Sequence, residues 1–172
     1  MDKDTKDTKD WTWVLDRPCP DCGFDATGVV AAALPDLIHA NTRGWYDALD
    51  RRDAATRPRP GVWSVLEYGC HVRDVHLLFA ERLRLMLDQD DPMFANWDQD
   101  ETAVEKAYGR QRADEVVVEL VEAAADVAAV YAGVEGEEWQ RQGRRSNGSA
   151  FTVASLGRYH LHDVVHHLWD VR

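Results

Sequence analysis

Four long stretches of the 172-residue chain carry apolar residues at helical spacing, and this periodicity constrains the fold more than any other feature. The stretches cover residues 27–50, 64–87, 116–134 and 152–172. A long polar connection, residues 89–114, follows the second stretch, and a short helix is expected in it around residues 102–108. The sequence shows no strand alternation of useful length, no internal repeat and no glycine-rich phosphate loop. We therefore predict an all-α protein built as a four-helix bundle.

Two of the expected helices carry signals of where they begin. Pro35 lies inside the first stretch, so that helix is expected to begin near it or to kink there. Ser64-Val-Leu-Glu67 has the pattern of a capping box and predicts a helix start at Ser64. The inward stripe of this second helix runs from Tyr68 to about residue 87, and His71 borders it.

The composition favours a single acidic domain without nucleic-acid or membrane partners. Hydrophobic residues make up 45% of the chain, which is enough for one sizeable core. A net charge of -11 argues against nucleic acid and anionic membranes, because both attract basic patches. No apolar run approaches the roughly 20 residues of a membrane span, and no apolar signal region begins the chain. Three cysteines suit a reducing compartment, so we expect a cytoplasmic protein with a small-molecule substrate.

The first 26 residues differ in character from the rest. Residues 1–10 alternate acidic and basic side chains, and we expect them to form a mobile tail. Residues 11–26 form an N-terminal extension, whose apolar island from Trp11 to Leu15 should dock on the bundle domain, residues 27–172.

The extension holds the motif Cys19-Pro-Asp-Cys22-Gly23, which looks like half of a zinc knuckle. A closed structural zinc site needs four ligands, and the sequence has no second cysteine pair. Only Cys70 remains, inside a predicted helix. Cys19 and Cys22 are therefore open to three interpretations: a tight turn with two packed or exposed thiols, a redox pair, or part of a shared metal site.

The last predicted helix carries four of the seven histidines of the chain. His162 and His166 stand one helical turn apart, so both rings project from one face, which we expect to look inward. Buried imidazoles need partners, and a divalent metal supplies one directly. We predict His71 as the third ligand. His167 lies about 100° further round the helix and is expected to be a neighbour rather than a ligand. The alternative is that these histidines are hydrogen-bonded residues of the core.

Further residues are candidates for supporting roles around such a metal. Asp74, Asp163 and Glu67 could accept imidazole N–H groups and so fix the orientation of the ligand rings. The aromatic residues Tyr68, Trp45 and Trp169 could line a pocket, although aromatic stripes also occur as plain core. The stretch from His162 to His166 lacks the glutamate of a zinc-protease helix motif, which argues against that chemistry.

The run Trp63-Ser-Val-Leu-Glu-Tyr-Gly-Cys-His-Val-Arg-Asp74, followed by His162-x-x-x-His166-His167, resembles the DinB-like metalloenzyme superfamily. This group includes mycothiol-dependent maleylpyruvate isomerases and bacillithiol S-transferases. The resemblance covers residues 27–172 and implies an up-down-down-up bundle, usually a homodimer. It also implies zinc or nickel held by one ligand from the second helix and two from the last, here His71, His162 and His166.

The resemblance further implies that the metal activates the sulfur of a low-molecular-weight thiol such as mycothiol. Our first hypothesis is thus a metal-dependent S-transferase or thiol-assisted isomerase acting on a small electrophile. A metal-dependent hydrolase is the second, because a bound water could replace the thiol. The third is a non-catalytic helical dimer in which the histidines bind a structural metal or none.

Overall fold

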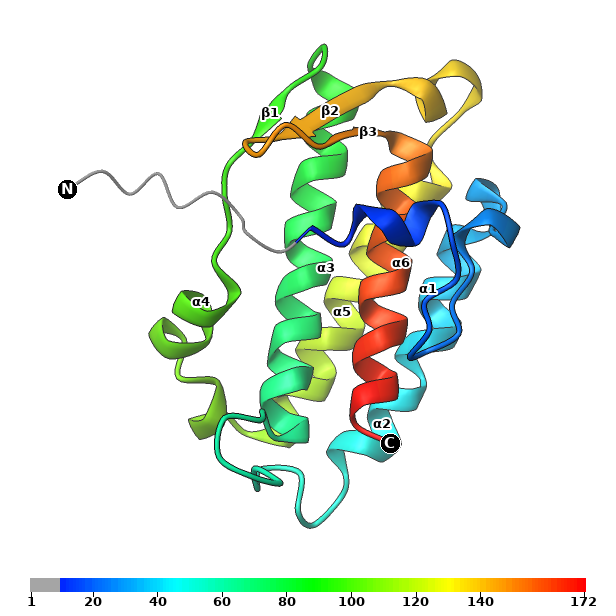
Figure 1. The fold of residues 1–172 in the computed structure, drawn as a ribbon. Coiled ribbons are helices and arrows are strands. Elements are labelled where there is room, and N and C mark those ends of the chain that lie inside the picture. The colour runs from blue at the N-terminus through cyan, green and yellow to red at the C-terminus, as the bar shows by residue number, and fades with distance from the viewer. Residues whose placement is uncertain (1–9) are drawn as a thin grey trace, which may run out of the picture.

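The computed structural model describes residues 10–172, and helices dominate it (Figure 1). The predicted tail, residues 1–10, lies outside the described residues except for Asp10. The α-helices are α1 (Leu34–Thr42), α2 (Gly44–Leu49), α3 (Val65–Asp88), α4 (Gln99–Glu105), α5 (Ala113–Ala132) and α6 (Val153–Asp170). Short 3-10 helices are η1 (Thr12–Leu15), η2 (Ala26–Gly28), η3 (Ala31–Ala33), η4 (Tyr108–Arg110) and η5 (Gly136–Gln140).

The bundle consists of α1 with its continuation α2, and of α3, α5 and α6. Helix α3 packs against α5 and α6, and α1 packs against the same two helices on the other side. In Figure 1, α1 and α6 run in one direction and α3 and α5 in the other. This is the up-down-down-up order, and the prediction of an all-α bundle with that topology is confirmed. The connection that carries α4 runs the length of the bundle because α3 and α5 are parallel.

Local sequence signals explain where the helices begin. The hydroxyl of Ser64 accepts from the backbone N–H of Glu67 at 3.2 Å, and Oε2 of Glu67 accepts from the backbone N–H of Ser64 at 2.8 Å. This capping box confirms the predicted start of α3. Pro35 occupies the first turn of α1, where its missing N–H costs no helical hydrogen bond.

A small sheet, which was not predicted from the sequence, closes one end of the bundle. Strand β2 (Gln142–Arg145) lies between β1 (Met93–Phe94), which pairs with it in parallel, and β3 (Ala150–Thr152), which pairs antiparallel. Each strand is too short to show an alternating pattern in the sequence. The sheet packs on the end of α3, where a Cβ on Gly143 would lie 2.7 Å from Phe94 and 2.8 Å from Met86.

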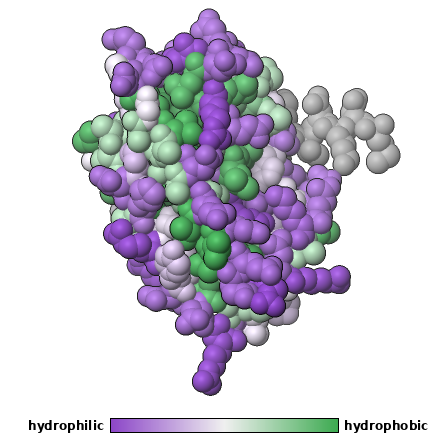
Figure 2. Space-filling model, turned by 180° about the vertical axis from the view of Figure 1, so that it is seen from behind, coloured by the Kyte–Doolittle hydropathy of each residue, from purple (hydrophilic) through white to green (hydrophobic). Residues whose placement is uncertain are grey.

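The apolar faces of the helices meet in one core. Leu34 and Tyr131 pack closely against Gly157 of α6. A Cβ added to Gly157 would lie 2.3 Å from the side chain of Leu34 and 3.1 Å from that of Tyr131. On the face seen in Figure 2, hydrophilic residues surround separate hydrophobic areas. Within residues 10–172, no helix combines the length and apolar character needed to cross a membrane.

Candidate metal centre

Two groups of metal-ligating side chains meet on α6. Within the described part of the chain, each group has ligand atoms that all lie within 4.8 Å of one another. The first consists of His71 from α3 with Asp163 and His167 from α6. The second consists of Cys19 and Cys22 with His162 and His166. The chain thus brings together two sets of potential ligands, and both draw on the last helix.

These groups differ from the predicted set of His71, His162 and His166. His162 and His166 do share a face, but the N-terminal extension covers it: Trp11 lies 6.0 Å and 5.6 Å from their rings, measured between ring centroids. Asp163 and His167 lie one residue further along, about 100° round the helix, and approach His71. His167, expected to be only a neighbour, therefore takes the place next to His71.

The polar atoms of the first group form a triangle that fits a divalent ion. Nε2 of His71 lies 3.1 Å from Nε2 of His167, and Oδ1 of Asp163 lies 3.8 Å and 3.5 Å from these two nitrogens. A triangle with such sides has a circumscribed radius of about 2.0 Å, the length of a zinc–nitrogen or zinc–oxygen bond. One point is thus at bonding distance from all three atoms, and three protein ligands leave further positions of an ion open.

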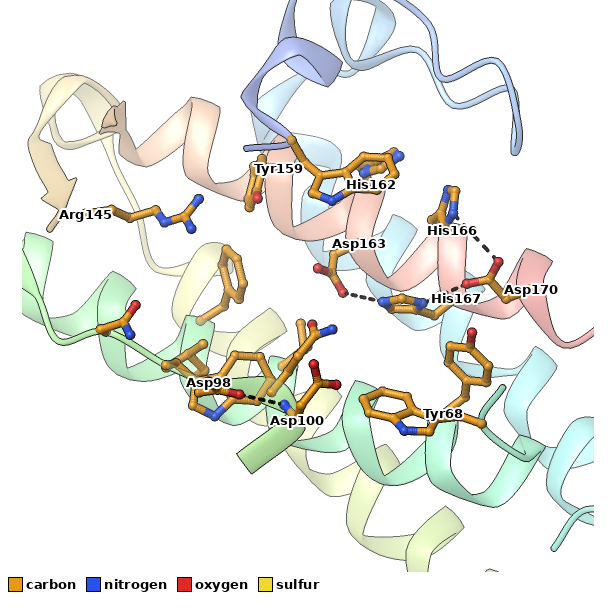
Figure 3. A pocket seen from close by; sticks show the side chains of 18 of the residues that line it. Tyr68, Asp98, Asp100, Arg145, Tyr159, His162, Asp163, His166, His167 and Asp170 are labelled. Atoms are coloured by element: carbon orange, nitrogen blue, oxygen red, sulfur yellow. Dashed lines mark hydrogen bonds and ion pairs between the residues drawn. The ribbon is translucent and has the colours of Figure 1, made fainter. Parts of the chain in front are cut away.

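Asp170 orients one ring of this group. Its Oδ2 lies 2.9 Å from Nδ1 of His167. A proton on Nδ1 is donated to this carboxylate, which leaves the lone pair of Nε2 directed at Asp163 (Figure 3) and at His71. Asp170 was not among the predicted site residues, although its place three residues after His167 puts it on the same side of the helix.

A cavity of about 840 Å³ opens beside the first group, between α3, α6 and the segment that precedes α4. Aromatic and polar side chains share its lining. Trp97 stacks on His71 at 5.5 Å, Trp63 lies 5.3 Å from the same ring, and Tyr68 lies 5.3 Å from His167, all between ring centroids. These contacts cover the rings of the two histidines with apolar surface.

Of the three predicted pocket residues, only Tyr68 lines this cavity. Trp45 is fully buried in the core, and Trp169 packs against His166 at 5.6 Å, on the side of the second group. Aromatic residues at helical spacing do not reveal which of them face the core, so the sequence could not separate these roles.

Two arginines supply positive charge to the cavity. Arg82 from α3 and Arg145 from β2 both line it, and both are buried. Burial lowers the pKa of Arg82 to about 10, so the guanidinium stays protonated at neutral pH. In Figure 3, Arg145 lies near the N-terminal end of α6, and His167 lies toward the other end. The cavity therefore holds two guanidinium groups in the same lining as Asp163 and His167, together with the carboxylates of Asp98, Asp100 and Asp170.

Asp74 and Glu67 do not support the histidines as predicted. Asp74 accepts hydrogen bonds from Tyr108 at 2.6 Å and from Lys106 at 2.9 Å, and it pairs with Arg73. Glu67 caps α3 and binds Arg57. Both carboxylates are thus occupied away from His71, and only Asp163 of the three predicted acceptors lies beside the imidazoles.

Burial shifts the pKa values of His162 and Asp163 on α6. It is the main cause that lowers the pKa of His162 to about 4, with the nearby His166 and His167 adding to the shift. Neutral imidazole is the form that binds a metal. Burial also raises the pKa of Asp163, whose negative charge would be stabilised by a cation beside it.

The fold and this cluster define a class: helical-bundle proteins with a candidate metal centre between two bundle helices. The family model of the DinB superfamily matches residues 36–171. The chain belongs to the DinB superfamily, as the resemblance in the sequence indicated.

Among solved structures, the chain is similar to YfiT from Bacillus subtilis, described as a probable metal-dependent hydrolase with an unusual four-helix bundle topology. The TM-score is 0.72 at 18% sequence identity, and the match covers 82% of this chain and 85% of YfiT. At this identity the similarity establishes the fold. A search of curated proteins finds no match.

Proposed function

We propose that the protein is a divalent-metal-dependent hydrolase acting on a small anionic substrate, with His71, Asp163 and His167 as the metal ligands. The observation that carries the proposal is the triangle of their ligand atoms, with sides of 3.1, 3.5 and 3.8 Å. Two further findings support it. The family resemblance implies one ligand from the second helix and two from the last, and YfiT is described as a probable metal-dependent hydrolase. Here a carboxylate would replace one imidazole of the last helix.

The choice of hydrolysis follows from the ligand set. When bound, a divalent ion such as zinc or nickel supplies Lewis acidity and lowers the pKa of a water or thiol at an open position. Two histidines with one carboxylate are the ligands of several zinc hydrolases. Asp170 keeps the proton of His167 on Nδ1, and Trp63 and Trp97 exclude water from the ring of His71.

We base the substrate class on the two arginines of the cavity lining, which also contains the carboxylates of Asp98, Asp100, Asp163 and Asp170. Arg82 and Arg145 place two buried guanidinium groups on its wall, and a guanidinium pairs well with carboxylate or phosphate. An anionic group bound there would leave the rest of a small substrate to reach toward His167. The aromatic residues of the lining suit an apolar part of the substrate.

Thiol S-transfer is the second candidate, and the size of the cavity favours it. A volume of about 840 Å³ lies in the upper part of the range for small-molecule sites, roughly 300–1,000 Å³. Such a site has room for a thiol cofactor such as mycothiol beside an electrophile.

The test combines metal content with turnover. We expect His71→Ala and Asp163→Asn to lose the ion of the bundle site, and the exposed His39 provides a matched control, His39→Ala, that keeps it. Retention of all metal in His71→Ala would contradict the ligand assignment. The 3.1 Å contact between His71 and His167 would then be a hydrogen bond between two neutral rings.

Turnover is then measured on chromogenic esters with and without a terminal carboxylate, each with and without mycothiol or bacillithiol. Hydrolysis without thiol, faster for the anionic esters and lost in His71→Ala, supports the proposal. Turnover that requires a thiol would replace hydrolysis by S-transfer. Absence of turnover under both conditions would contradict both candidates and leave a non-catalytic metal site.

A further inference from the structure

The second cluster on α6 has a different chemistry: His162 and His166 line the edge of the cavity together with Trp11, and Cys19 and Cys22 lie behind them, outside its lining. Cys19, Cys22, His162 and His166 offer two sulfur and two nitrogen atoms that all lie within 4.8 Å of one another. Sγ of Cys19 is 3.6 Å from Nδ1 of His166. Ligands of one tetrahedral zinc ion, with bonds of about 2.0–2.3 Å, lie about 3.3–3.8 Å apart. The observed separation falls in that range, and both cysteines are free of disulfides.

The local backbone presents both thiols to the same helix. The N–H of Gly23 donates to the carbonyl of Cys19 at 2.9 Å, and the N–H of Cys19 donates to the carbonyl of Phe24 at 2.8 Å. This tight turn requires the left-handed conformation of Gly23, whose φ is +74°. The turn holds Cys19 and Cys22 side by side, opposite the two rings that stand one helical turn apart on α6.

Two of the four side chains of the cluster are buried, and one of its nitrogen atoms has no hydrogen-bond partner among the described residues. Trp11 and Phe24 cover the ring of His162, which is 4% exposed, and Cys19 is 1% exposed. Nε2 of His162 is buried and makes no hydrogen bond with another described residue. A buried polar atom without a partner costs on the order of 1–3 kcal/mol. A cation bound by the cluster would remove that cost.

We infer that Cys19, Cys22, His162 and His166 form a structural zinc site, distinct from the bundle centre. Two thiolates and two imidazoles in tetrahedral reach are characteristic of zinc. All four positions would be filled by protein atoms, which leaves none for substrate and makes the site structural. Binding would release the two thiol protons to solvent and leave each sulfur as a thiolate.

Such an ion would attach the N-terminal extension to α6. The extension contacts this helix through η1 and η2, and zinc would add four bonds across the same contact. It would also fix the rotation of α6 about its axis. Asp163 directly follows His162 in the sequence and His167 directly follows His166, so fixing one pair fixes the direction of the other. The site would thereby hold the bundle ligands in place without taking part in their chemistry.

The test uses cobalt as a spectroscopic probe, together with zinc content. In the full-length protein loaded with cobalt we expect a thiolate-to-cobalt charge-transfer band and the visible bands of tetrahedral cobalt. The double variant Cys19→Ser/Cys22→Ser should lose the charge-transfer band and about one zinc ion per chain. Cys70→Ala is the matched control, since Cys70 lies on α3 beside Gln111 and Tyr108.

His71→Ala should keep the charge-transfer band while it loses the bundle ion, so the failure of one site is distinguishable from the failure of the other. The inference is overturned if the wild-type protein shows no thiolate band, or if Cys70→Ala alone removes it. A disulfide between Cys19 and Cys22 in the purified protein would also overturn it. The wild-type spectrum decides the matter even if the double variant does not fold.

Discussion

The buried histidine pair between α3 and α6 predicts how the stability of the protein depends on pH. Nδ1 of His76 lies 3.0 Å from Nε2 of His160, and neither ring is exposed to solvent. Burial lowers the pKa of His76 to about 3, from the usual 6.5. The ring is therefore neutral in the folded protein at every pH above that value, whereas in the unfolded chain it gains a proton below pH 6.5.

The size of the effect follows from this difference. The unfolded chain binds more protons than the folded one between about pH 6.5 and 3, so the contribution of His76 to stability is complete at neutral pH and declines as the pH falls. Each pH unit below the unfolded pKa costs about 1.4 kcal/mol. From pH 7.5 to pH 5 the loss is about 2 kcal/mol for this one residue.

The variant His76→Asn isolates this contribution. An asparagine amide can occupy the place of Nδ1 and keep the hydrogen bond to His160, but it does not titrate. Urea unfolding, followed by tryptophan fluorescence, measures the free energy of unfolding of both proteins at pH 7.5 and at pH 5. We expect this free energy to fall with pH in both proteins, and the fall to be about 2 kcal/mol smaller in the variant than in the wild type. Other titrating groups are common to both proteins and cancel.

The exposed His39 provides the control, because His39→Asn should leave the pH dependence unchanged. Parallel stability curves for His76→Asn and the wild type over this range would refute the reasoning. They would mean that the folded protein accommodates the charge of His76 at little cost.

Two further predictions concern α6. Asp170→Ala removes the acceptor of the Nδ1 proton of His167, and we expect the affinity of the bundle site for zinc to fall about 10–100-fold. Competition with a chromophoric chelator measures this affinity. An unchanged affinity would exclude an orienting role for Asp170. Gly157→Ala places a methyl group 2.3 Å from Leu34, and thermal and urea unfolding should report a loss of about 1–3 kcal/mol. Gly28→Ala meets no atom within 4 Å, so its stability should stay close to that of the wild type.

The bundle could be predicted from the sequence because its signals are local. The capping residues Ser64 and Glu67 define the start of α3, and helical spacing of apolar residues extends through each long helix. The sheet could not be predicted in this way. Strands β1 and β3 have two and three residues, and they exist because a distant segment, β2, lies between them. The pairing of β1 with β2 depends on where the segment after α5 lies relative to the end of α3, and no local sequence pattern encodes that position.

The candidate ligands were recognisable in the sequence by residue type, but their grouping was not. The segment from His162 to His167 contains two pairs at a spacing of four, and each pair suits a metal. Choosing between the pairs requires knowledge of which face of α6 meets α3. That depends on packing over the whole bundle, including the close approach of Leu34 to Gly157.

The N-terminal extension resolves the ambiguity between the two pairs. Trp11 and the Cys19–Cys22 turn pack on the face of α6 that carries His162 and His166, whereas Asp163 and His167 approach His71. A step of one residue, about 100° of rotation, is what separates that face from the one with Asp163 and His167. The motif that resembled half of a zinc knuckle contributes two of the four side chains of the second candidate group. The side chains that face His71 are an aspartate and a histidine, so the candidate ligand set contains one carboxylate in place of an imidazole.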